Sequence, residues 1–261
     1  MACSSAAALR RTLSSFATSR LSLRAASHRH LSYSGSLLGT LYSSPGTPSP
    51  DTVHFYLEEA GITERVLVEK MSILSRSPAN RSEEFLKMNP MGEVPALRLA
   101  DGKVLTESLV ICRYLDAQHT GGAGSPLYGE SAAERAETDI WVARTETKYL
   151  TPLIWAARCG PLAKFFENRT PGYIHTVISD PMGEAAKTGL IWLEAQLADG
   201  RPFLCGERFT IADIRLVVNY KFLTNVHKPM RAQADEQPAF LKYVERVAAR
   251  DGAAALASKT K

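Results

Sequence analysis

The hydrophobic periodicity of this chain changes at the glycine-rich segment HTGGAGSPLYGE, which begins at His119. Before it, short strand-like runs alternate with helix-like runs; after it, apolar residues recur at helical spacing alone. This pattern predicts an α/β unit followed by an all-α helical bundle. We place the first domain at 37–119, the linker at 120–130 and the helical domain at 131–261.

The α/β unit contains four strand-like runs, at 37–43, 65–71, 94–100 and 103–107. The last two are joined by Ala100-Asp101-Gly102, and Asp-Gly between alternating apolar residues is a strong hairpin signal. Because an antiparallel hairpin follows a strand–helix–strand unit, we expect a small mixed sheet of about four strands.

The helical domain contains four long amphipathic runs, at 132–150, 183–198, 210–223 and 238–250. The third begins with Thr210-Ile211-Ala212-Asp213, which is a capping-box arrangement. The hydroxyl of Thr210 can accept the amide of Asp213, and the Asp213 carboxylate can accept the amide of Thr210. We expect this pair to be a structural cap.

The charge of the chain is unevenly distributed. No acidic residue precedes Asp51, and the five basic residues before it are all arginines, namely Arg10, Arg11, Arg20, Arg24 and Arg29. Without them, 26 basic residues face 27 acidic ones, so the net charge does not favour nucleic-acid binding. No apolar run reaches the roughly 18 residues that a membrane-spanning helix needs.

Residues 1–36 are rich in Ser, Ala and Arg and contain neither Lys nor acid. This composition is typical of an organelle transit peptide, disordered and outside the fold. The string RHLSYS, from Arg29 to Ser34, resembles mitochondrial processing sites. We therefore expect a mitochondrial protein, with the plastid as the alternative.

The cysteines give no redox or metal motif. Cys3 lies in the expected transit peptide, and Cys112, Cys159 and Cys205 are widely spaced, with no C-x-x-C pair. Cys112 lies in the apolar run SLVICRYL and is expected in the core. We expect a reducing compartment and no metal site.

Three short motifs could carry chemistry. Thr47-Pro48 and Ser49-Pro50 place hydroxyls at the start of the first helix, where they can cap the helix or stabilise an anion. Val94-Pro95 opens a strand, and a cis bond there would turn the backbone of Val94 toward an extended ligand. Glu107 and Ser108 begin the next helix and can cap it or bind an ammonium and a carboxylate.

The order and spacing of these motifs resemble the soluble glutathione transferase family, from about residue 38 to the end. The strings NPMGEVPAL, LTESLVICRYL, RPFLCGERFTIADI and QPAFLKYVERVAARDG carry the resemblance. It implies a thioredoxin-like domain followed by a helical domain, with a homodimer expected. It also implies glutathione as co-substrate and a small apolar electrophile, with the helical domain supplying the apolar pocket.

The resemblance assigns roles to individual residues. Val94 and Pro95 would pair with the glutathione backbone, and Glu107 and Ser108 would hold its γ-glutamyl end. In the serine-type classes, which are the most similar, the activating hydroxyl follows the Tyr of a leading Leu-Tyr by five residues. Counting from Tyr42, this position is Thr47, with Ser49 as the alternative.

Some positions depart from the family pattern. Pro48 stands where cysteine-using classes carry the reactive thiol, and Glu93 replaces the more usual Gln or Lys. These departures leave two alternatives to conjugation: a non-catalytic scaffold or dimerisation subunit of an organellar complex, and a glutathione-dependent reductase or peroxidase. Trp141, Tyr149 and Trp155 are candidates for the walls of the apolar pocket, with plain core as the alternative.

Overall fold

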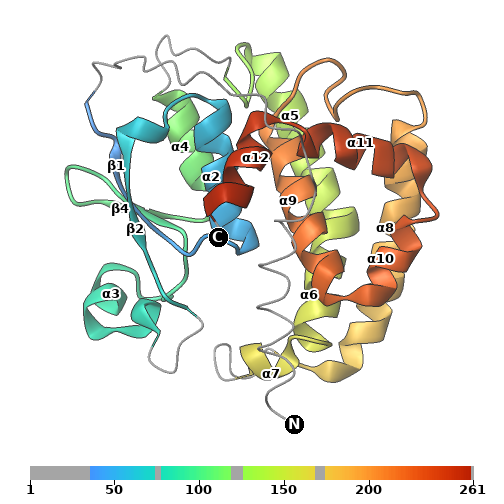
Figure 1. Cartoon of the computed structure of the whole chain (residues 1–261), viewed down its shortest axis with the longest axis horizontal. Coiled ribbons are helices and arrows are strands. Elements are labelled where there is room, and N and C mark those ends of the chain that lie inside the picture. The colour runs from blue at the N-terminus through green and yellow to red at the C-terminus, as the bar shows by residue number, and fades with distance from the viewer. Residues whose placement is uncertain (1–35, 74–77, 119–125, 168–173, 260–261) are drawn as a thin grey trace. The chain divides into compact units, whose positions relative to one another are not determined.

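The computed structural model describes residues 36–73, 78–118, 126–167 and 174–259 (Figure 1). They form two compact units, one of 36–118 with 255–259 and one of 126–254. The transit peptide expected at 1–36 lies outside the described residues except for Ser36, and so does the linker as far as residue 125.

The first unit is built on a four-stranded mixed sheet, as expected from the sequence, and the structure places its strands in the order β2-β1-β3-β4. β1 pairs in parallel with β2 and antiparallel with β3, and β3 pairs antiparallel with β4. The strands are β1 (Gly39–Ser43), β2 (Val66–Lys70), β3 (Ala96–Arg98) and β4 (Val104–Thr106).

The two faces of the sheet are covered by different helices. Successive side chains of a strand point to opposite faces, so Leu41 and Ser43 of β1 share one face and Tyr42 points to the other. On the first face lie α2 (Pro48–Glu59) and α4 (Ser108–Ala117), side by side (Figure 1). On the other face, Tyr42 packs edge-on against Phe85 of α3 (Glu83–Met88), in a core cluster with Met71 and Ala96.

The second unit contains helices and no named strand among its described residues. The helices are α5 (Ala132–Thr145), α6 (Thr151–Cys159), α7 (Ala163–Phe166), α8 (Ser179–Leu197), α9 (Ile211–Val226), α10 (Lys228–Ala234) and α11 (Pro238–Ala248). The terminal helix α12 (Asp251–Lys259) extends past the residues of this unit. Among the described residues, short 3-10 helices span Thr63–Arg65 and Ala79–Arg81 in the first unit and Thr176–Ile178 in the second.

The centre of the second unit is α9. Eleven of its sixteen residues are buried, and it packs against α5, α6, α10 and α11. Most of its buried residues are apolar, such as Ile214, Leu216 and Val217, which explains its place in the core. The expected pair of Thr210 and Asp213 lies at its first turn. The Asp213 carboxylate accepts the Thr210 amide at 2.8 Å, as expected, while the Thr210 hydroxyl donates to the same carboxylate at 3.1 Å.

The helix expected at 132–150 differs from the structure in one respect. It changes to a π-helical segment at Glu146–Leu150, η3, and then continues as α6. At η3 the backbone lies very close to α8. A Cβ added to Gly189 of α8 would overlap the carbonyl oxygen of Lys148 in η3. Only glycine permits this approach without a shift of one of the helices.

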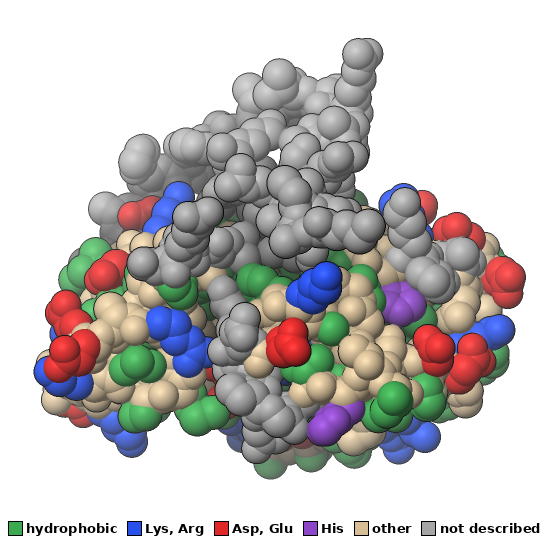
Figure 2. All heavy atoms as spheres, turned by 90° about the horizontal axis from the view of Figure 1, so that it is seen from below, with side chains coloured by type: hydrophobic (Ala, Val, Ile, Leu, Met, Phe, Trp, Pro, Cys, Tyr) green, Lys and Arg blue, Asp and Glu red, His purple; other side chains and the backbone are tan. Residues whose placement is uncertain are grey.

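The described helices include none with the length and hydropathy needed to cross a bilayer. On the face shown in Figure 2, acidic and basic side chains of the described residues are interspersed. The coloured surface there shows no large patch of one sign, of the kind that a nucleic-acid interface presents.

Candidate functional site

The three sequence motifs leave the sheet at the same end. Tyr42 of β1 pairs with Ala96 of β3, and Ala96 pairs with Thr106 of β4. These residues form one row across the sheet. The chain reaches Thr47 after it leaves β1 and Glu107 after it leaves β4, and it passes Val94 just before it enters β3. Because β3 is antiparallel to β1 and β4, the three motifs lie at the same end of the sheet.

Thr47 is the residue before the first turn of α2, but its side chain makes no capping bond. An N-cap hydroxyl normally accepts the amide of the second or third helical residue. Here the third is Pro50, which has no N–H, and the Thr47 hydroxyl instead donates to the carbonyl of Ser44 at 2.7 Å. The hydroxyl is half-buried and already oriented.

The start of α2 has few backbone donors. Pro48 is its first residue and Pro50 its third, so Ser49 supplies the one backbone N–H among these three residues. Stabilisation of an anion there rests on this amide, the helix dipole and nearby hydroxyls. The side chain of Ser49 is half-buried, two residues from Thr47.

The Val94-Pro95 peptide bond is cis, as the sequence analysis proposed. Val94 lies before the first residue of β3 and outside the strand ladder. The loop that leads to it is held by buried amides: Asn89 Nδ2 donates to the carbonyl of Glu93 at 2.8 Å and Asn80 Nδ2 to that of Gly92 at 2.7 Å. Glu93 itself is exposed.

Glu107 adopts an unusual backbone conformation, with φ of 64°, the one positive value among the described non-glycine residues. Such a conformation costs about 1 to 3 kcal/mol and is found where a site constrains the chain. Glu107 is exposed and its side chain does not cap α4, whereas Ser108 is buried at the first position of the helix. The strained turn therefore presents an acid beside a helix N-terminus.

Two buried polar pairs near Thr47 escaped the sequence analysis. Ser43 Oγ lies 2.9 Å from His54 Nε2, and the amide of Gly46 donates to Asp51 Oδ1 at 2.8 Å. Their sequence signal is weak: Ser43 ends an apolar strand, and Asp51 and His54 lie three residues apart on the inward face of α2.

Two of the aromatic residues considered as pocket walls belong to the core of the second unit. Tyr149 is fully buried and packs edge-on against Phe240 of α11. Trp141 is 6% exposed, and its ring meets that of Trp192 on α8. Trp155 on α6 is half-buried and remains a candidate.

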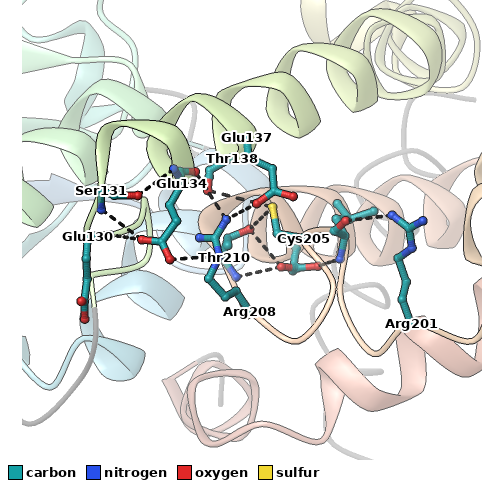
Figure 3. Close-up of polar contacts among 11 residues, drawn as sticks. Glu130, Ser131, Glu134, Glu137, Thr138, Arg201, Cys205, Arg208 and Thr210 are labelled. Atoms are coloured by element: carbon teal, nitrogen blue, oxygen red, sulfur yellow. Dashed lines mark hydrogen bonds and ion pairs between the residues drawn. The ribbon is translucent and has the colours of Figure 1, made fainter.

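A polar network joins the first turns of α5 and α9 (Figure 3). Ser131 and Glu134 form a capping box, and the backbone amides of Ser131 and Glu130 lower the pKa of the Glu134 carboxyl. Arg208 pairs with Glu137, linking the loop before α9 to α5. The network connects two helix starts and is structural.

The cysteines of the described residues, Cys112, Cys159 and Cys205, are free and buried. Cys205 lies within the network of Figure 3, with Sγ 3.9 Å from Thr210 Oγ1. Burial raises the pKa of this thiol, which opposes thiolate formation. No group of three possible metal ligands occurs in the described part of the chain.

The fold and the site define a thioredoxin-like protein with a second, all-helical domain. The N-terminal domain of glutathione S-transferases matches residues 48–118, and their C-terminal domain matches 149–246. The chain belongs to the glutathione transferase family.

Individual relatives differ in function. "Glutathione S-transferase 2" of Saccharomyces cerevisiae is 24% identical over 213 residues, 78% of this chain and 84% of that one. "Probable elongation factor 1-gamma 2" of Arabidopsis thaliana is 32% identical over 158 residues, 59% of this chain but 34% of that one. The structure of a Pseudomonas fluorescens family member with bound glutathione has a TM-score of 0.63 at 26% identity, covering 83% of this chain and 97% of that one.

Proposed function

We propose that this protein binds glutathione at the end of the sheet and conjugates its thiolate to small apolar electrophiles. The observation that supports the proposal is the row formed by Tyr42, Ala96 and Thr106, because Thr47, Val94 and the Glu107-Ser108 turn all lie beyond it at the same end of the sheet. The backbone of Val94 would pair with the peptide. Glu107 and Ser108 would bind the ammonium and carboxylate of its γ-glutamyl end.

The hydroxyl of Thr47 would stabilise the thiolate. Lowering a thiol pKa from about 8.5 by two units takes about 2.7 kcal/mol. A hydrogen bond to a charged group contributes about 1.5 to 3 kcal/mol and a helix N-terminus about 0.3 to 1. To donate to the thiolate, the Thr47 hydroxyl must give up its hydrogen bond to the Ser44 carbonyl, which costs about 1 kcal/mol. Stabilisation of the thiolate by Ser49 therefore matters.

Glutathione binding tests this proposal directly. We expect the protein to be retained on immobilised glutathione and to accelerate the reaction of glutathione with an activated aryl halide. Glu107→Ala and Ser108→Ala should each weaken glutathione binding at least tenfold in calorimetric titration, since each leaves a ligand charge without a partner.

Ser131→Ala is the matched control for Ser108→Ala, because Ser131 is also a serine at a helix start but lies in the other unit. It should cost about 1 kcal/mol of stability and leave the affinity unchanged. Unaltered affinity in both site variants would refute the site.

A non-catalytic scaffold is the second candidate function. The similarity to elongation factor 1-gamma favours it, as does the engagement of the Thr47 hydroxyl by Ser44. A chain that is not retained on glutathione and shows no conjugation would support this role. A glutathione-dependent reductase or peroxidase is the remaining alternative. It has less support, because Pro48 stands where cysteine-using classes carry the reactive thiol and the described cysteines are buried.

Import into mitochondria and a homodimeric state are further proposals. The arginine-bearing, acid-free segment supports import, with the plastid as the alternative, and the mature chain should begin near residues 32 to 37. Mass spectrometry of the native protein tests this. Exposed apolar side chains such as Val110 on α4, 50% exposed, are consistent with a dimer, which sedimentation velocity can test.

A further inference from the structure

The loop between β1 and α2 is attached to α2 at both of its ends. At its start, Ser43 Oγ meets His54 Nε2 at 2.9 Å, in the middle of the helix. At its end, the amide of Gly46 donates to Asp51 Oδ1 at 2.8 Å, in the first turn. Gly46 has φ of 89°, a conformation that glycine adopts readily.

These attachments are buried. Ser43 is 0% exposed, His54 2% and Asp51 4%. Burying a polar group costs free energy unless it is hydrogen-bonded, and a hydrogen bond that is made contributes modestly to net stability. What a hydrogen bond adds is direction, because it fixes the orientation of the loop backbone as well as its distance from the helix.

The backbone so fixed controls one functional side chain. The carbonyl of Ser44 accepts the hydroxyl of Thr47 at 2.7 Å, and Ser44 directly follows Ser43. Gly46, at the other attachment, directly precedes Thr47. The two buried pairs thus fix the residues on either side of this contact.

We propose that Ser43, His54 and Asp51 are positioning residues that hold Thr47 in place for activation of the glutathione thiol. This inference rests on the proposed conjugating function. Ser43 has no exposed surface and so does not touch substrate. The three residues act through the loop backbone. Removing an attachment lets residues 44–47 shift, and with them the position from which the Thr47 hydroxyl, once released from the Ser44 carbonyl, would reach the sulfur.

The test measures the pH titration of the bound glutathione thiol by its ultraviolet absorbance, together with kcat and KM. Ser43→Ala removes a single oxygen, and Asp51→Ala removes the other attachment. Each should raise the pKa of the bound thiol by about half to one unit and lower kcat near neutral pH by roughly three- to tenfold. The KM for glutathione should stay within about twofold, because the contacts to its backbone and γ-glutamyl end are elsewhere.

Two further variants distinguish positioning from stability. Asp51→Asn keeps Oδ1 as an acceptor for Gly46 but removes the negative charge, so it is the charge-matched reference for Asp51→Ala and should not raise the pKa of the bound thiol. Thr52→Val is isosteric and removes the bond from the Thr52 hydroxyl to the Pro48 carbonyl in the same helix, without touching the loop. It should lower the melting temperature yet leave the thiol titration unchanged.

The possible failures are distinct. If the wild type conjugates and Thr47→Val impairs it, but Ser43→Ala and Asp51→Ala behave like Thr52→Val, the positioning role is wrong and the proposed function stands. If the wild type neither binds nor conjugates glutathione, the proposed function fails, and the positioning role fails with it.

Discussion

The hydroxyl of Tyr243 donates a hydrogen bond of 2.9 Å to Oδ1 of Asp213, thirty residues earlier in the chain. The same carboxylate accepts the amides of Leu204 at 2.9 Å and Thr210 at 2.8 Å. Burial raises the pKa of Asp213, and these hydrogen bonds oppose that shift. These hydrogen bonds link the first turn of α9 to α11 and to the loop that precedes α9.

Tyr243→Phe should destabilise the helical unit by about 1 to 3 kcal/mol, because it withdraws a donor from a fully buried carboxylate. Urea denaturation measures this as a lower midpoint with an unchanged m value. Wild-type stability in this variant would mean that the bond contributes nothing net.

Tyr149→Phe is the matched control, with the opposite expected sign. Tyr149 is as buried as Tyr243, but its hydroxyl has no hydrogen-bond partner among the described residues. Removing an unsatisfied buried hydroxyl should be neutral or stabilising, by up to about 1 to 3 kcal/mol. Destabilisation as large as that of Tyr243→Phe would show that the Tyr149 hydroxyl is satisfied in solution.

Stability should fall as the pH rises above about 10. Burial, helped by repulsion from Asp235, raises the pKa of Tyr220 to about 12, and burial raises the pKa values of Tyr149 and Tyr243 well above the ordinary value of 10. Between the unfolded and folded pKa values the unfolded chain has released protons that the native state keeps. Alkali therefore favours unfolding.

In that pH window, each such phenol lowers the free energy of unfolding by about 1.4 kcal/mol per pH unit. Tyr220→Phe should remove the contribution of one phenol from the pH dependence of the unfolding free energy. Urea denaturation at pH values from 9 to about 12 measures this. Equal slopes in wild type and variant would show that Tyr220 ionises in the folded protein as readily as in the unfolded chain.

Gly189→Ala should destabilise the protein by about 1 to 3 kcal/mol or more, since the added methyl overlaps the carbonyl of Lys148 and separates α8 from η3. Gly183→Ala, in the same helix, is the control. Its added methyl meets no atom within 4 Å, so it should gain up to about 1 kcal/mol of helix propensity. Thermal unfolding of the pair measures both, and similar melting temperatures would show that the α8–η3 contact yields easily.

Thr47→Val should raise the pKa of the bound glutathione thiol by about one to two units, because it keeps the shape of the side chain and removes the donor. Turnover near neutral pH should fall by roughly tenfold to a hundredfold, while glutathione affinity barely changes. Ultraviolet titration of the complex measures the shift.

Ser49→Ala is the companion variant. If only Ser49→Ala moves the thiol titration, Ser49 is the activating hydroxyl and the assignment is wrong by two residues. If neither variant moves it, activation by a hydroxyl is wrong, and the Ser49 amide with the helix dipole is left as the source of stabilisation.

The fold class could be read from the sequence because it depends on local patterns. The change from mixed to purely helical periodicity predicts both domains, the Asp101-Gly102 turn predicts the β3–β4 hairpin, and Thr210 with Asp213 predicts the start of α9. Each of these signals comes from residues a few positions apart, whose interactions are set by the geometry of one turn, helix or hairpin.

What each polar side chain binds was decided by the tertiary structure. The sequence marks Thr47 as an N-cap, but its hydroxyl points to Ser44, and the burial of Ser43 against His54 depends on how β1 packs on α2. Tyr149 suits a pocket wall by type, yet α11 covers it with Phe240. Burial and hydrogen-bond partners arise from contacts between distant segments, so one sequence pattern is compatible with several partners until the packing selects one.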